Sequence, residues 1–167
     1  MTTAQISFHP APKLAQCETG VMPPAANNAV TVVTRVWLDE YAWLEALYND
    51  VANSSPKLRY PDLISACVSL VFNRPGADLR IFTFLHTRLV LRDQHTARRQ
   101  EEMWREQYEL LLALQKSEQN RHPHPQFKLD HFTTACVALA MEEDGAKSKL
   151  FEHARRNIAR RAATQSR

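Results

Sequence analysis

The fold of this chain is decided by the stretch VTVVTRVWLD, from Val30 to Asp39. The stretch is rich in β-branched residues, contains no glycine or proline, and ends at an aspartate that suits the start of a helix. We therefore predict a strand that runs directly into a helix. A strand this short is stable only with a second strand and an apolar layer, so the rest of the chain must supply both.

Two short repeats indicate where the second strand lies. The segment ACVSL at 66–70 returns as ACVAL at 135–139, and TRVWL at 34–38 returns as TRLVL at 87–91. Both repeats keep their order along the chain, which favours two copies of one unit. The sequence therefore predicts the second strand within residues 81–92.

Helical patterns follow each predicted strand. Apolar residues recur at helical spacing over residues 40–53, and a nearly all-apolar segment over 61–73 predicts the central buried helix. In the second copy a long polar helix is expected at 96–119 and a buried helix at 130–143. A last, basic helix begins near residue 146. The expected fold class is α+β, mostly helical.

Composition fits an ordinary globular protein with a basic end. The chain has 167 residues, 44% of them hydrophobic, and a net charge of only +3. From residue 146 onward the only acidic residue among the many basic ones is Glu152. The last helix either contacts DNA backbone non-specifically or packs on the core with its arginines in solvent.

The cysteines and the apolar runs predict a cytoplasmic location. Cys17, Cys67 and Cys136 are an odd number and widely spaced, which favours free thiols over disulfides. No apolar run approaches the roughly 20 residues of a membrane span, so no membrane contact is expected. Prolines interrupt the N-terminal apolar residues, so no signal peptide is expected either.

Four segments make up the predicted organisation. Residues 1–29 hold several prolines and no period, which is typical of a disordered or loosely packed tail. Residues 30–76 form the first half and 77–145 the second, with a longer first helix. Residues 146–167 form the basic C-terminal helix.

This pattern resembles the ribbon-helix-helix, or MetJ/Arc-type, superfamily of repressors. The resemblance is carried by the stretch RVWLD at 35–39, the amphipathic helix after it, a basic loop and an apolar helix. It implies a single-chain, pseudo-twofold form, with a two-stranded antiparallel ribbon, four helices and an extra C-terminal helix. Such tandem modules are similar to accessory proteins of conjugative relaxosomes and of T-DNA transfer.

A ribbon of this kind fits the major groove of DNA. Alternation places Thr34, Val36 and Leu38 on the core face, because Leu38 directly precedes the helix. The outward face then offers the candidate base contacts Val33, Arg35, Trp37, His86, Arg88 and Val90. The alternative is a structural role without DNA contact, in which Trp37 and Val90 pack under another element and the arginines are ordinary surface charges.

Phosphate contacts are expected at the start of each buried helix, where backbone N–H groups favour an anion. Lys57 and Arg59 precede the first such helix and Lys128 precedes the second. The alternative for all three is a solvated loop charge.

No catalytic, metal-binding or cofactor-binding residue is predicted, and we expect a protein that is not an enzyme. The histidines show no zinc spacing with the cysteines, and His122 and His124 flank a proline, which favours a turn over a metal site. The expected partner is double-stranded DNA, with a relaxase or another DNA-processing protein as a further partner. A monomer supplies both halves, and a higher assembly on DNA stays open.

The expected function is therefore major-groove recognition, as an accessory factor in plasmid or conjugative DNA processing or as a transcriptional repressor. The alternative is a helical adaptor that holds a protein partner, through the same fold or its long helix at 96–119, without touching DNA.

Overall fold

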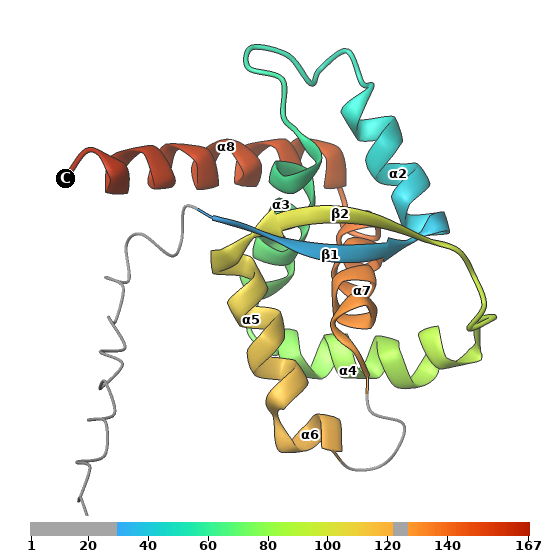
Figure 1. Ribbon diagram of the computed structural model, residues 1–167. Helices are drawn as coiled ribbons and strands as arrows, with labels where there is room; N and C mark the ends of the chain where they lie inside the picture. The colour runs from blue at the N-terminus through green and yellow to red at the C-terminus, as the bar shows by residue number, and fades with distance from the viewer. Residues whose placement is uncertain (1–29, 122–126) are drawn as a thin grey trace, which may run out of the picture.

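A two-stranded ribbon lies across a set of helices in the computed structural model, which describes residues 30–121 and 127–167 (Figure 1). The described residues form an α+β structure that is mostly helical. In chain order its elements are β1 (Thr31–Trp37), α2 (Leu38–Tyr48), α3 (Tyr60–Phe72), α4 (Ala77–Thr87), the 3-10 helix η1 (Leu89–Leu91), β2 (Arg98–Trp104), α5 (Arg105–Lys116), α6 (Glu118–Arg121), α7 (Leu129–Met141) and α8 (Ala146–Gln165).

The ribbon is antiparallel and runs in register over its whole length. Thr31 pairs with Trp104 at one end, Thr34 with Glu101 in the middle, and Trp37 with Arg98 at the other end. Two further backbone bonds, from Leu38 and Arg105 to the carbonyls of residues 97 and 30, continue the pairing beyond both strands. The two strands are thus made by one chain.

The two most buried helices, α3 and α7, lie under the ribbon (Figure 1). Helix α7 packs on β1 and α3 packs on β2. Side-chain hydroxyls fix both contacts: Thr134 Oγ1 accepts from the Trp37 N–H at 3.2 Å, and Ser65 Oγ accepts from the Trp104 N–H at 2.9 Å. The helix of one strand-helix-helix stretch therefore supports the strand of the other.

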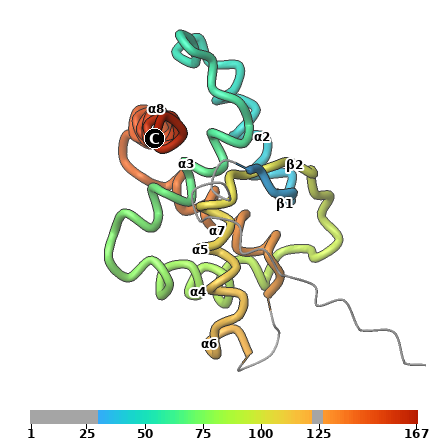
Figure 2. The backbone as a smooth tube through the Cα atoms, turned by 60° about the vertical axis from the view of Figure 1, so that its left-hand side comes forward, coloured from blue at the N-terminus to red at the C-terminus, as the bar shows by residue number. Residues whose placement is uncertain are grey.

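Helices α4 and α8 cover the α3 and α7 pair from opposite sides (Figures 1 and 2). Each begins after a glycine with positive φ, Gly76 at 75° and Gly145 at 66°. A residue with a side chain rarely adopts this conformation, so glycine allows the sharp turn from one helix into the next. Helix α4 packs on α7, while α8 packs mainly on α3.

The predicted position of the second strand, residues 81–92, is wrong. This segment forms the larger part of α4 and then η1. Its buried side chains recur at helical spacing: Ile81, Phe82, Phe84, Leu85 and Leu89. The true second strand, RRQEEMW, has weak strand propensity and is held extended by pairing with β1 and by burial of Met103.

The prediction of one long helix at 96–119 is also wrong. Its first part is β2, its central part is α5, and the chain turns at Ser117 before the short α6. The apolar residue Leu111 does lie in the core, as expected for the inner side of this helix. A helical adaptor can therefore not use a helix of that length.

The other predicted elements are found close to their expected positions. The first strand, both buried helices and the C-terminal helix are confirmed, although α2 ends at Tyr48 and not near residue 53. Leu38 was expected in the core but is 43% exposed, because it is already the first residue of α2. The predicted tail, residues 1–29, lies outside the described residues. None of the helices in the described ranges combines the length and apolarity needed to cross a bilayer.

Asn53 and Asn120 hold the two loops that lead into α3 and α7. The Asn53 side chain donates to the carbonyls of the last residue of α2 and of Leu58, and accepts from the Leu58 N–H at 2.7 Å. Asn120 makes the same three bonds, to a carbonyl near the end of α5 and to the backbone of Phe127. Both asparagines are buried, each 4% exposed.

We predict that Asn53→Ala lowers the free energy of unfolding by about 2–3 kcal/mol, because it leaves three backbone groups without their partner at about 1 kcal/mol each. Urea denaturation measures this. Asn49→Ala is the matched control: Asn49 is exposed at the end of α2, and its loss should change stability by less than about 0.5 kcal/mol. Equal effects of the two substitutions would contradict the proposed role of Asn53.

Candidate nucleic-acid interface

Two neighbouring cross-strand pairs form the solvent-exposed face of the ribbon. Val33 pairs with Glu102 and Arg35 with Gln100, and all four side chains are exposed. On the opposite side of the ribbon, Val36 and Met103 are fully buried, whereas Arg99 at its edge is exposed. We call Val33, Arg35, Gln100 and Glu102 the ribbon face.

Two of the three contacts predicted on the first strand are exposed in the structure, and the third is buried. Val33 and Arg35 lie on the ribbon face, as expected. Trp37 does not offer its ring to solvent: it is fully buried, with the Arg98 guanidinium 4.7 Å above its ring and His131 at its edge. The alternative that Trp37 packs under another element is therefore the correct one.

The predicted contacts on the second strand lie away from the ribbon. His86 is on α4 and packs edge-on against Phe127, while Val90 is in η1. Arg88 follows α4 and forms an ion pair with Glu142. Their assignment to the ribbon is wrong because the segment from 81 to 92 is helical.

Sequence reasoning missed the exposed residues of β2, which are Arg99 and the two ribbon-face residues Gln100 and Glu102. A signal for them exists in the sequence. Trp37 is followed by Asp39 and Tyr41, and Trp104 is followed in the same spacing by Glu106 and Tyr108. This shared pattern marks the step from strand into helix in both places.

A partly buried cluster lies at the Trp104 end of the ribbon. The indole Nε1 donates to Asp62 Oδ1 at 2.8 Å, and Arg161 from α8 donates to the same oxygen at 3.1 Å. The Arg161 guanidinium also lies 3.9 Å from the center of the Trp104 ring. Burial lowers the pKa of Arg161 while the Asp62 carboxylate opposes that change. The cluster ties the ribbon, α3 and α8 together.

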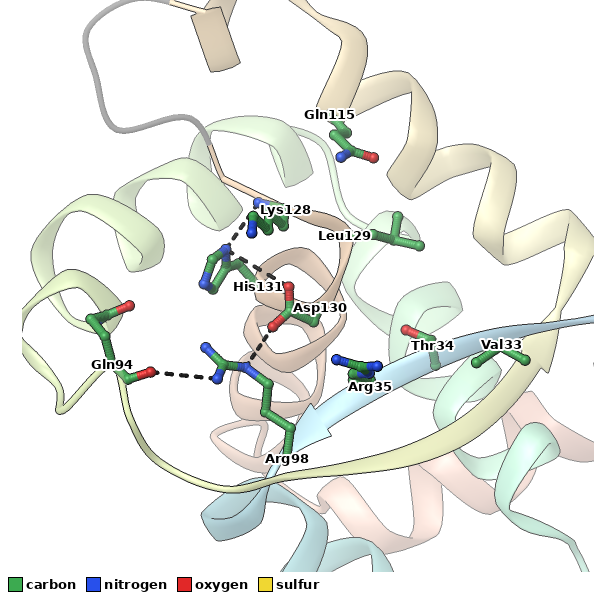
Figure 3. Close-up of a pocket in the computed structure, with 10 residues that line it drawn as sticks. All are labelled: Val33, Thr34, Arg35, Gln94, Arg98, Gln115, Lys128, Leu129, Asp130 and His131. Atoms are coloured by element: carbon green, nitrogen blue, oxygen red, sulfur yellow. Dashed lines mark hydrogen bonds and ion pairs between the residues drawn. The ribbon is translucent and has the colours of Figure 1, made fainter.

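A second cluster of different composition lies at the Trp37 end of the ribbon (Figure 3). Arg98 Nε donates to Asp130 at 2.7 Å, and His131 Nδ1 accepts from the Lys128 N–H at 2.9 Å. The proton of the neutral His131 ring is therefore on Nε2, which leaves that ring no acceptor for an indole N–H. Trp37 Nε1 is buried and has no hydrogen-bond partner among the described residues.

A groove opens beside this second cluster. It has a volume of about 750 Å³ and is bounded by β1, the end of α5 and the start of α7. Figure 3 shows Arg35 and Arg98 on the ribbon side of the groove and Lys128 at the start of α7. Asp130 neutralises Arg98. Arg35 and Lys128 also line the groove, and neither forms an ion pair with another of the described residues.

The predicted phosphate contacts lie directly before the two buried helices. Arg59 and Lys128 are the residues that precede the first turns of α3 and α7, and Lys57 lies two residues before Arg59. The side chain of Arg59 is 65% exposed, and Lys57 and Lys128 are exposed as well. The three side chains are therefore accessible at the starts of the two buried helices.

A stack of three tyrosines supports the loop before α3. Tyr41 and Tyr60 stack at 5.4 Å between ring centers, and Tyr60 and Tyr48 stack at 4.6 Å. Lys57 lies over Tyr48 at 4.1 Å, and Arg99 lies over Tyr41 at 5.5 Å. The tyrosine stack, defined as these three rings, thus carries a cation at each end.

Searches against protein-family models, curated proteins and solved structures found no match to this chain. Across residues 30–121 and 127–167, no group of three or more His, Cys, Asp or Glu side chains is placed to hold a metal ion. His122, His124 and Cys17 lie outside these ranges. Cys67 and Cys136 are buried free thiols, and burial raises the pKa of both.

We predict that stability falls as the pH drops below 6.5. Burial lowers the pKa of His131 from its ordinary 6.5; Arg98 and Lys128 act in the same direction and Asp130 opposes them. The unfolded chain therefore takes up a proton that the folded chain resists, and acid favours unfolding in that window. His131→Asn, which keeps an acceptor for the Lys128 N–H, should flatten the dependence.

Thermal unfolding measured between pH 5 and pH 7.5 checks this prediction. The pKa of His153 is also lowered by burial, so His153→Asn is run in parallel to separate the two contributions. If the pH dependence of stability is unchanged in His131→Asn, then groups other than His131 cause the loss of stability in acid.

Proposed function

We propose that this chain is a single-chain ribbon-helix-helix protein that binds double-stranded DNA through its ribbon face. The observation that carries the proposal is an exposed two-stranded ribbon whose exposed side chains are of the types that read base edges. Arginine pairs with guanine, glutamine with adenine, glutamate accepts from cytosine, and an apolar side chain contacts the thymine methyl. Arg35, Gln100, Glu102 and Val33 supply one of each.

A pseudo-twofold relation between the halves is part of the proposal. Matched positions support it: Trp37 and Trp104 end the strands, Asn53 and Asn120 hold the loops, and Gly76 and Gly145 begin the outer helices. The register supports it too, since Thr34 and Glu101 occupy matching positions and are directly opposed. An axis through that pair relates one strand to the other.

Contacts to the DNA backbone follow from the position of the two buried helices under the ribbon. The ribbon in the major groove brings the starts of α3 and α7 toward the flanking phosphates, where N–H groups and positive dipole ends favour anions. Lys57, Arg59 and Lys128 are exposed at these two places. They hold the protein on DNA without selecting a sequence.

The resemblance also suggests a cellular role. We propose an accessory factor in plasmid or conjugative DNA processing, with a relaxase as protein partner, or a repressor. One chain contains both strands of the ribbon, so a monomer has a complete reading surface.

A protein-binding adaptor is the second candidate, and an apolar groove between α4 and α7 favours it. The groove has a volume of about 340 Å³ and includes Leu79, Phe84 and Leu139, with Leu79 65% exposed. Binding to random duplex DNA separates the candidates: affinity that falls steeply from low to physiological salt supports DNA binding. No binding at low salt supports the adaptor.

We predict that Arg35→Ala and Gln100→Ala each flatten sequence preference, because each removes a base contact worth about 1–3 kcal/mol of discrimination. Arg88→Ala is the matched control, since Arg88 lies beyond α4 and away from the ribbon. Competition between a selected site and random duplex measures the preference. An effect of Arg88→Ala as large as that of Arg35→Ala would refute the ribbon as the reading surface.

A different outcome is expected for a phosphate contact. Lys57→Ala should weaken binding to selected and random duplexes equally, and should reduce the slope of log affinity against log salt by about 1. Titrations at several salt concentrations measure the slope. A loss confined to the selected site would instead assign Lys57 to base recognition.

A further inference from the structure

The ribbon face is not the same on its two strands. When β1 and β2 are matched through Trp37 and Trp104, Val33 corresponds to Gln100 and Arg35 corresponds to Glu102. An apolar side chain in one half thus stands where an amide stands in the other. A cation in one half stands where an anion stands in the other.

These differences change the kind of DNA that fits. A protein with a true twofold axis presents the same side chains twice, which is why its site is palindromic. Arg35 favours the acceptors of guanine, whereas Glu102, at the matching place, favours the amino group of cytosine. An inverted repeat would offer both the same edge, so one of the two would meet a poor partner.

The flanks of the ribbon differ as well. Beside α3, the tyrosine stack carries Lys57 and Arg99 at its ends. The residues matching Tyr48 and Tyr60 are Gln115 and Leu129, so the described residues beside α7 form no such stack. That flank has the groove with Arg98 paired to Asp130 instead. The backbone contacts on the two sides are therefore unequal too.

We infer that the protein recognises a non-palindromic duplex site and binds it in one orientation. The inference rests on the proposed DNA binding through the ribbon face. Val33, Arg35, Gln100 and Glu102 set the order of bases along the site. The α3 flank and the α7 flank then lie on defined sides of it.

Selection of duplexes from a random library by the full chain tests this inference. The expected result is an enriched motif that differs from its own reverse complement. An enriched palindrome or inverted repeat would overturn the inference while leaving DNA binding intact. Absence of any enriched sequence would refute sequence reading by the ribbon itself.

A symmetrised ribbon provides the sharper test. The double variant Gln100→Val with Glu102→Arg presents valine and arginine at matching places on both strands, and both changes are at exposed positions. Its selected motif should become an inverted repeat, preferred over the wild-type motif by about tenfold or more. An unchanged thermal midpoint shows that the fold is kept. Retention of the wild-type motif by this variant would overturn the assignment of these residues.

Orientation can be read directly with tethered DNA cleavage. An iron chelate on Lys57→Cys or on Lys128→Cys, each in a Cys17→Ser chain, marks the α3 or the α7 flank; Cys67 and Cys136 are buried and stay unlabelled. Each label should cut one end of the selected site, and the two labels should cut opposite ends. Cleavage at both ends by each label would show two orientations and overturn the inference.

Discussion

Pairing between β1 and β2 is the constraint on which the rest of the structure depends. Neither strand has a partner other than its neighbour among the described residues. Because α7 packs on β1 and α3 packs on β2, each buried helix contacts the strand that lies farther from it in the sequence, and both contacts require the paired ribbon. Loss of the pairing would uncover Val36 and Met103 together with both buried helices. The core therefore forms as a whole.

The tryptophans at the two ends of the ribbon are covered in similar ways, but their indole N–H groups are not satisfied in the same way. Each strand ends in a tryptophan that is covered by an arginine paired with a carboxylate. At Trp104 the carboxylate of Asp62 also satisfies the indole N–H. At Trp37 the matching place on the helix is His131, and the indole N–H has no acceptor among the described residues. An unsatisfied buried donor costs about 1–3 kcal/mol. Each end has one among the described residues, Trp37 Nε1 at one end and an Nη atom of Arg161 at the other.

Sequence alone predicts those elements whose signal is local. The β-branched stretch at β1 and the apolar runs of α3 and α7 need no knowledge of the rest of the chain. Strand β2 is different, because four of its seven residues, RRQEEMW, are charged and only its neighbour makes it extended. The likeness of TRLVL to TRVWL misled because a short apolar run fits a period of two or of 3.6. The exposure of Val33 and Arg35 on the ribbon was predicted correctly, while that of Gln100 and Glu102 depended on finding β2.

The covalent link between the two strands has a thermodynamic consequence. When two separate chains form a ribbon, dilution drives them apart, so folding depends on protein concentration. Here both strands belong to one polypeptide, and ribbon formation is a unimolecular step whose equilibrium is indifferent to dilution. The same link means that a substitution in β1 is not repeated in β2. A mutation in a homodimer appears twice, whereas a mutation in this chain appears once.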